Sequence, residues 1–375
     1  MELDAGLTDR RRHTRGSIYR HIYEAKSFCS RQSLARELGL SLPTVYQNLS
    51  ELMSAGLVRD SGEQQSTGGR KASGLSIVPD ARVAVGISLT EDHLLLVAAD
   101  LLLNEMAYRS IPFHPTTPFP IPDGLLAQQL EDFLDDFSID RQRLLGVGIA
   151  LPGMISQDSS YITVAPTLSI KNTSLKELTS RIPYPTYVEN DATCSGYAEW
   201  YFQSGRRNIA YLLLDNGVGG AILIGGSPYN GDNRRGAEFG HMCIEPSGLR
   251  CSCGRQGCLE AYCTTRRIYE MGLTLPEFFE KVEHCDPSCS LLWDNMLRHI
   301  AIGAYNIRVA LDCDVVLGGL LREYLGSYLP RLKEYAAACN PFEDSAEYLH
   351  LSALRRHTAP LGVALHFVTD FLENL

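Results

Sequence analysis

The 375-residue sequence lacks any run of about eighteen apolar residues, the minimum that a membrane-spanning helix needs. It also lacks the apolar segment of a secretory signal, because its first sixteen residues read MELDAGLTDRRRHTRG. A hydrophobic fraction of 45% is typical of a soluble globular protein, and the length predicts two or three domains. The sequence therefore predicts a protein with no membrane partner.

Positive charge is scarce overall, since the formal net charge is −10. Residues 1–80 nevertheless carry 11 basic against 9 acidic side chains, whereas the remainder carries 23 against 35. Between Arg10 and Arg36, eight basic side chains accompany one acidic side chain, Glu24. A basic N-terminal segment on an acidic body indicates that only this segment binds a polyanion, although a solvated helix face has the same composition.

The eleven cysteines do not indicate a disulfide framework, because their number is odd and the chain is large. Three of them, with one histidine, have the spacing H-x9-C-x-C-x4-C: His241, Cys251, Cys253 and Cys258. One imidazole and three thiolates make a closed tetrahedral set for a structural zinc ion. A metal site of this kind favours a reducing cytoplasm as the location of the protein.

Three N-terminal segments have the apolar spacing of helices. The first is expected near 16–27, the second follows a predicted N-cap at Ser30 and stops at Gly39, and the third follows a predicted N-cap at Ser41. Helix, glycine-containing turn and helix is the plan of the helix-turn-helix, whose second element enters the major groove of DNA.

The outward side of the third helix is expected to read DNA. Thr44, Gln47 and Asn48 lie away from the predicted apolar stripe and have side chains able to bond base edges. A glycine-rich segment with Arg70 and Lys71 then lies between two predicted strands and is interpreted as a wing that reaches phosphate or the minor groove. An ordinary pair of helices imitates this motif, but the combination favours DNA binding.

The rest of the chain has an α/β texture. Two predicted β-hairpins begin at Ala81 and Asn208, and each is followed by alternating helices and strands. The order strand, strand, helix, strand, helix occurs twice. It predicts an α/β body of two similar lobes with a cleft between them.

Several stretches of the body resemble the ROK family (repressor, open reading frame, kinase). They are GVGIALPG at 146–153, VENDATCSGYAEW at 188–200, DNGVGGAILIGG at 215–226, the block from GAEFGHM to GCLEAY, and VVLGGLL at 315–321. The resemblance implies a two-lobed, actin-like (ribonuclease-H-like) sugar-kinase fold. The preceding winged helix resembles the repressor branch of the family, which includes xylose- and N-acetylglucosamine-responsive regulators.

The resemblance also implies which residues bind a sugar. Asn190 and Asp191 match a motif in which the Asn binds a sugar hydroxyl and the Asp is the general base of the kinases. Glu238 and His241 match a sugar-contacting ExGH motif, Glu260 matches a sugar-binding Glu after the last cysteine, and Gly153 lines the pocket. Asp191 is also expected to cap the helix that follows it. His241 and the three cysteines match the zinc ligands of the family.

One departure from the family concerns the kinase reaction. Family kinases carry a DxGGT turn after the first strand, whereas the matching segment here, Gly86–Asp92, has Ser88 in place of the Asp and lacks both glycines. Side chains at Leu89 and Thr90 obstruct the approach of a phosphate to backbone N–H groups, and Glu91 and Asp92 repel it. The sequence therefore predicts a non-enzymatic protein.

Together these features predict a sugar-responsive, DNA-binding transcriptional regulator that is a homodimer or homotetramer on a palindromic operator. The predicted domains are a winged helix-turn-helix at 1–80, a first lobe at 81–190 and a second lobe at 191–375, with a C-terminal helix that returns to the first lobe. Two alternatives stay open: an ATP-dependent sugar kinase with a fused DNA-binding domain, and a pocket that binds a protein partner.

Overall fold

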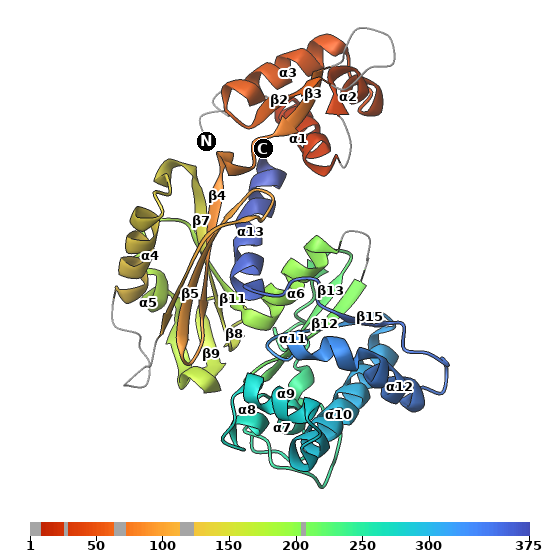
Figure 1. Cartoon of the computed structure of the whole chain (residues 1–375). Coiled ribbons are helices and arrows are strands. Elements are labelled where there is room, and N and C mark those ends of the chain that lie inside the picture. Colours follow the sequence, from red (N-terminus) through yellow and green to blue (C-terminus); the bar gives the residue numbers. More distant parts are fainter. Residues whose placement is uncertain (1–8, 26–28, 64–72, 113–123, 204–207) are drawn as a thin grey trace.

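The computed structural model describes residues 9–25, 29–63, 73–112, 124–203 and 208–375. Figure 1 shows an N-terminal head above a body of two lobes, each with its own sheet, and the C-terminal helix running up toward the head. No helix within these residues is long and apolar enough to cross a membrane.

The head is a three-helix unit with a small antiparallel sheet of order β1-β3-β2. Its elements are α1 (Asp9–Glu24), β1 (Cys29–Ser30), α2 (Arg31–Glu37), α3 (Leu42–Ser54), β2 (Val58–Glu63) and β3 (Ser73–Ile77). The predicted N-caps are confirmed, because the Ser30 hydroxyl accepts from Ser33 N and the Ser41 hydroxyl accepts from Thr44 N. Gly39 has φ +63°, which suits glycine after a helix.

The first helix begins seven residues earlier than the apolar spacing predicted. Its N-terminal turns are polar, so no apolar stripe marks them in the sequence. Arg11 forms an ion pair with Glu51 of α3, and Arg15 is fully buried and donates to the backbone oxygen of Leu375. Polar contacts therefore stabilise the part of α1 that hydrophobic periodicity does not detect.

The first lobe contains a five-stranded sheet of order β11-β7-β4-β5-β6 and a three-stranded sheet of order β10-β9-β8. Strands β4, β7 and β11 are parallel, and β5 and β6 pair antiparallel at one edge. The elements are β4 (Val83–Leu89), β5 (His93–Asp100), β6 (Glu105–Pro112), α4 (Leu125–Asp136), β7 (Leu144–Leu151), β8 (Met154–Ile155), β9 (Tyr161–Ala165), β10 (Ile170–Ser174), α5 (Leu175–Thr179) and β11 (Thr186–Asn190).

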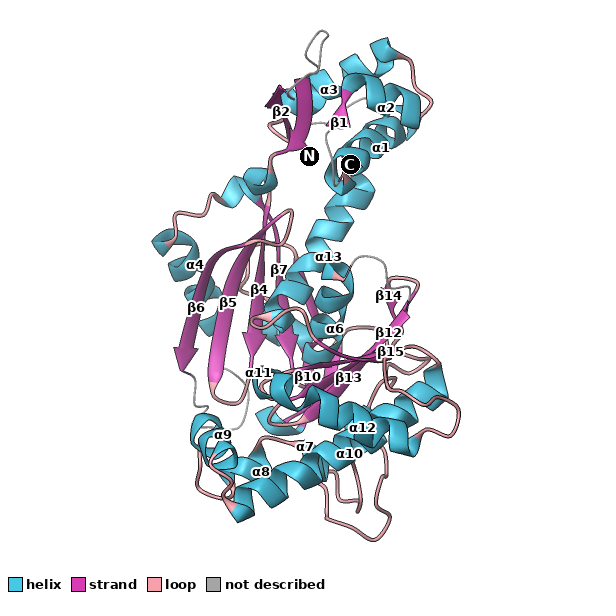
Figure 2. Ribbon diagram, turned by 45° about the vertical axis from the view of Figure 1, so that its right-hand side comes forward, coloured by secondary structure: helices cyan, strands magenta, loops and turns pink. Residues whose placement is uncertain are grey.

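The second lobe contains a five-stranded sheet of order β14-β13-β12-β15-β16, and the predicted hairpin is β12–β13. Helices cover its outer side in Figure 2. The elements are α6 (Asp191–Phe202), β12 (Asn208–Leu214), β13 (Val218–Ile224), β14 (Ser227–Pro228), α7 (Glu260–Cys263), α8 (Arg266–Tyr269), α9 (Leu275–Glu283), α10 (Pro287–Leu311), β15 (Asp314–Gly318), α11 (Arg322–Leu325), α12 (Leu329–Cys339) and β16 (Leu349–Leu351).

The last helix, α13 (Thr358–Asn374), packs against α6 and against β4 and β7. Its Gly362 lies so close to α6 that a Cβ atom there would come within 1.8 Å of the Cys194 oxygen. One continuous hydrophobic core joins the head, β5 and α13, so the head packs against the body in addition to being connected to it by the chain. The Arg20 guanidinium adds a hydrogen bond of 2.8 Å to the backbone oxygen of Leu372.

Candidate functional site

The structure brings together the four predicted metal ligands. The ligand atoms of His241, Cys251, Cys253 and Cys258 all lie within 4.8 Å of one another. Cys251 Sγ lies 3.8 Å from His241 Nδ1, and Cys253 Sγ lies 3.7 Å from Cys258 Sγ. The distance between the Cys253 and Cys258 sulfurs is too long for a disulfide, whose sulfurs are about 2.05 Å apart, and all three cysteines of the cluster are free thiols.

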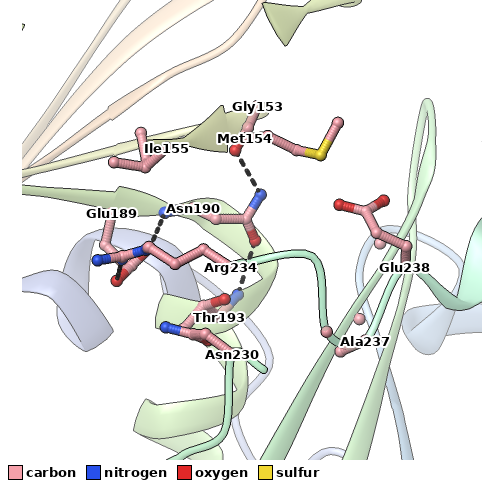
Figure 3. Close-up of a pocket in the computed structure, with 13 residues that line it drawn as sticks. Gly153, Met154, Ile155, Glu189, Asn190, Thr193, Asn230, Arg234, Ala237 and Glu238 are labelled. Carbon is pink, nitrogen blue, oxygen red and sulfur yellow. Dashed lines mark hydrogen bonds and ion pairs between the residues drawn. The ribbon is translucent and has the colours of Figure 1, made fainter. Parts of the chain in front are cut away.

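A cavity of about 430 Å³, counted with its open mouth, lies between the lobes. Figure 3 shows its lining, to which the first lobe contributes residues near the ends of β7 and β11 and the second lobe contributes the loop after β14. The lining residues are Gly153, Met154, Ile155, Glu189, Asn190, Thr193, Gly219, Gly220, Asn230, Arg234, Gly236, Ala237 and Glu238. Three of the predicted sugar-binding residues are therefore in the lining, namely Gly153, Asn190 and Glu238.

Asn190 fixes the start of α6 at the floor of this cavity. Its side-chain oxygen accepts from Thr193 N at 3.0 Å, and its amide nitrogen donates to the Gly153 oxygen at 3.1 Å (Figure 3). The predicted N-cap at Asp191 is therefore wrong by one residue: Asn190 caps the helix and Asp191 is its first residue. Gly153 is required because a Cβ atom there would lie 2.6 Å from the Ala165 Cβ.

Carboxylates with raised pKa values gather beside the cavity. Burial raises the pKa of Asp191 to about 6, with further contributions from the negative charges of Asp215 and Glu238. Burial likewise raises the pKa of Asp215 to about 6. Burial also raises the pKa of Glu238, and the nearby charge of Glu260 adds to that rise. Such groups accept hydrogen bonds readily from hydroxyls, which relieve their poor solvation.

Asp191, His241 and Glu260, the other predicted sugar ligands, are not among the residues that line the cavity. The Glu260 carboxylate accepts from Val218 N at 3.2 Å and from the Ser252 hydroxyl at 2.8 Å. It therefore ties the glycine turn between β12 and β13 to the metal-binding loop. His241 follows Glu238 in a short 3-10 helix, Phe239–His241, so a metal bound at His241 would restrain the backbone that carries Glu238.

Arg234 is a pocket residue that the sequence did not reveal. From the second lobe, its guanidinium forms an ion pair with Glu189 at the end of β11 and donates to the Ser159 hydroxyl at 2.9 Å. Figure 3 shows this pair and Glu238 on different sides of the cavity. Arg234 and Glu189 are 45 positions apart, and no local pattern marks such a pair.

A second contact between the lobes involves the altered turn after β4. The Glu91 carboxylate accepts from Asn216 Nδ2 at 3.2 Å and from Arg266 Nη2 at 3.1 Å. Asn216 belongs to the glycine turn of the second lobe, and its side-chain oxygen accepts from the Thr265 hydroxyl at 2.6 Å. The acidic turn of the first lobe is therefore bound by hydrogen bonds to the turn that faces it.

On α3, the prediction that Asn48 faces outward is wrong. Its side chain is 3% exposed and donates to the Thr44 oxygen at 2.8 Å, so it cannot read a base edge in this conformation. Gln47 is exposed, and Thr44 is partly exposed with its hydroxyl 2.8 Å from the Ser41 hydroxyl. Tyr46, which we did not predict, is 56% exposed on the same helix. The predicted wing residues Arg70 and Lys71 lie outside the described residues.

The structure has a winged helix-turn-helix head on a two-lobed body, a pocket between the lobes, and a His-Cys cluster that includes His241, close to Glu238 of the pocket. These features define a protein of the sugar-kinase fold with a DNA-binding-type domain. The chain belongs to the ROK family: the ROK family model matches residues 85–365. A winged helix-turn-helix DNA-binding model matches residues 11–59.

Relatives with known names include regulators and kinases. The xylose repressor of Bacillus subtilis is 28% identical over 242 residues, which cover 64% of this chain and 62% of that protein. A crystal structure of a ROK family transcriptional regulator, described as a homolog of the Escherichia coli MLC protein, has a TM-score of 0.76 at 20% identity and covers 97% of both chains. A ROK family glucokinase from Streptomyces griseus, in complex with glucose and AMPPNP, has a TM-score of 0.65 at 20% identity and covers 76% of this chain and 98% of that chain.

Proposed function

We propose that this protein is a DNA-binding transcriptional regulator, a repressor by similarity to its relatives, whose affinity for an operator changes when a sugar binds between its lobes. We propose residues 1–80 as the DNA-binding domain and residues 81–190 and 191–375 as the two lobes, with α13 returning to the first. The observation that supports this function most is the course of α6, because its N-cap Asn190 lines the pocket and Tyr201 near its other end bonds Tyr23 of the head.

Helix α6 has 12 residues and is therefore about 18 Å long. Its first residue is Asp191, beside the pocket, and near its end the Tyr201 hydroxyl bonds the hydroxyl of Tyr23 in α1. The same Tyr23 hydroxyl donates to the Leu101 oxygen at 2.7 Å. A movement of the helix start on ligand binding therefore reaches the head through one rigid element.

The C-terminal half of α6 is anchored by a buried carboxylate. Glu199 is 0% exposed and accepts hydrogen bonds from the Ser352 hydroxyl at 2.5 Å and from Ala353 N at 2.8 Å. These partners belong to the segment that connects β16 to α13. Because α13 contacts the head as well, α6 and α13 form a pair that couples the pocket to α1.

The altered turn after β4 supports the proposal that the protein has no kinase activity. A kinase needs a cationic, glycine-rich cradle for the nucleotide phosphates. In this chain Glu91 occupies that turn and binds Asn216 and Arg266 of the facing lobe. An incoming ATP would have to break both contacts and approach a carboxylate, which the electrostatics oppose.

We propose zinc as the metal of the His-Cys cluster. Zn–S bonds of about 2.3 Å in a tetrahedron place two sulfurs about 3.8 Å apart, and the Cys253 and Cys258 sulfurs are separated by 3.7 Å. Four protein ligands leave no open position for substrate, so the ion would be structural. It would hold His241 and, through it, the backbone of Glu238.

The DNA-binding surface is proposed to be the exposed side of α3 with Thr44, Gln47 and Tyr46, together with Arg70 and Lys71 of the wing. One short recognition helix gives little specificity by itself. A homodimer or homotetramer on a palindromic operator is therefore part of the proposal.

Selection of binding sequences from a random DNA pool by the full chain tests this function. We expect a palindromic site whose affinity falls about tenfold or more in Gln47→Ala, the loss expected for one base-reading side chain. Gln128→Ala, an exposed residue of α4, is the matched control and should bind normally. A second assay adds ATP, Mg²⁺ and a panel of sugars. Sugar-dependent ADP release that Asp191→Ala abolishes would favour the kinase alternative.

A further inference from the structure

A second cavity opens directly beside the pocket between the lobes. It measures about 500 Å³ with its open mouth and shares Met154, Ile155 and Arg234 with the first cavity. Its other lining residues come from the β8–β9 hairpin and from the loop after β14: Ser156, Gln157, Thr163, Asn233 and Arg235. A ligand that fills the inner pocket can therefore extend into this outer cavity.

The two cavities differ in charge. The inner pocket is lined by Glu189 and Glu238 together with Arg234, whereas the outer cavity is lined by Arg234 and Arg235 and by no carboxylate. Asp158, in the same hairpin, accepts from the Ser156 hydroxyl at 2.6 Å and does not line the cavity. The outer cavity therefore combines cations with neutral hydrogen-bond donors.

The two arginines are not equally available. Arg234 is already neutralised by Glu189 and bonded to Ser159. Arg235 is exposed, and its guanidinium makes no ion pair or hydrogen bond with the part of the chain that the structure describes. It is thus the cation of this cavity that is free to bind a ligand, with the Asn233 and Gln157 amides beside it.

We infer that the outer cavity is a subsite for an anionic substituent, so that the effector is a sugar carrying a phosphate or a carboxylate. This inference rests on the proposed sugar-binding function. The sugar ring lies in the inner pocket, where its hydroxyls donate to the Glu238 carboxylate, and the anionic group extends past Met154 toward Arg235. A guanidinium can donate two parallel hydrogen bonds to two oxygens of either anion.

Isothermal titration with matched ligands tests the subsite. The probes are glucose with glucose 6-phosphate and glucuronate, and N-acetylglucosamine with its 6-phosphate. We expect one anionic member to bind about tenfold or more tightly than its neutral parent, the gain expected for a charged hydrogen bond. Preference for a phosphate over glucuronate, or the reverse, identifies the anion. A neutral sugar that binds as tightly as its anionic partners would overturn the subsite, whereas no binding by any sugar would overturn the proposed function itself.

The variant Arg235→Gln provides a second test of the anionic subsite, because glutamine keeps hydrogen-bonding ability without the charge. The affinity for the anionic ligand should fall about tenfold while the affinity for the neutral parent stays within about twofold. Arg356→Gln changes net charge equally at an exposed position outside both cavities and should bind like the unmodified chain. Equal losses for anionic and neutral ligands in Arg235→Gln would mean that Arg235 only shapes the loop, which contradicts the inference.

Discussion

Replacing Asp191 with asparagine is expected to stabilise the folded protein at neutral and alkaline pH, even though Asp191 borders the ligand pocket. Burial and the negative charges of Asp215 and Glu238 raise the pKa of Asp191 from 3.8 to about 6. Asparagine is nearly isosteric and can accept the same hydrogen bond from Ala192 N, which is 2.8 Å long. The substitution therefore removes the cost of the buried charge and keeps the local geometry.

The direction in which the stability changes with pH follows from proton binding. Between pH 4 and pH 6 the folded protein retains a proton on Asp191 that the unfolded chain has released, so the free energy of unfolding falls as the pH rises. Above pH 6 the charged Asp191 lowers the free energy of unfolding by the full difference between the two pKa values, 3.8 and about 6. This difference corresponds to about 3 kcal/mol as an upper limit. At pH 4.5 the same difference contributes about 1 kcal/mol. The advantage of Asp191→Asn should therefore grow by about 2 kcal/mol between pH 4.5 and pH 8.

Urea denaturation of both proteins at pH 4.5 and pH 8 measures this change. Asp294→Asn is the control of opposite sign, because partial burial, which raises the pKa of Asp294, is outweighed by hydrogen bonds from Tyr335 and Arg298 and by the charge of Arg331, which hold that pKa below its ordinary value. That variant should lose stability by nearly the same amount at pH 8 and at pH 4.5, because a pKa below 3.8 leaves Asp294 charged in the folded protein at both values. An Asp191→Asn protein that is less stable at pH 8, or whose advantage does not change with pH, would refute the reasoning.

Three further variants test other parts of the molecule. Tyr201→Phe should bind sugar within about twofold of normal but lose most of the effect of sugar on operator affinity, whereas the exposed control Tyr161→Phe should keep it. Cys253→Ser should lose bound zinc by elemental analysis and melt at a lower temperature, and Cys285→Ser, outside the cluster, should do neither. Glu238→Gln should weaken sugar binding about tenfold by titration calorimetry, and an unchanged affinity would remove Glu238 from the pocket chemistry.

Much of this architecture is visible in the sequence because its causes are local. The Ser30 and Ser41 caps depend on residues three positions apart, and the β4–β5 and β12–β13 hairpins and the set of metal ligands each lie within fewer than twenty consecutive positions. Local rules of capping, alternation and ligand spacing therefore predict them.

The features that the sequence did not reveal depend on tertiary contacts. Asn48 looks outward on a helical wheel, yet the core of the head covers it. Arg234 and Glu91 resemble solvent-exposed charges until the lobes come together and give each of them a partner across the cleft. Arg15 interrupts no pattern in the sequence, and its burial involves tertiary contacts with Leu375, which follows α13, and with Glu51 of α3.

Coupling between the pocket and the head is tested most directly by fluorescence anisotropy of a labelled operator, selected from the random pool, with and without the sugar that titration identifies. We expect the operator dissociation constant to change by about fivefold or more when sugar is saturating. By thermodynamic linkage the sugar dissociation constant must change by the same factor when operator is saturating. A sugar that binds tightly between the lobes while both constants stay unchanged would contradict the proposed regulator.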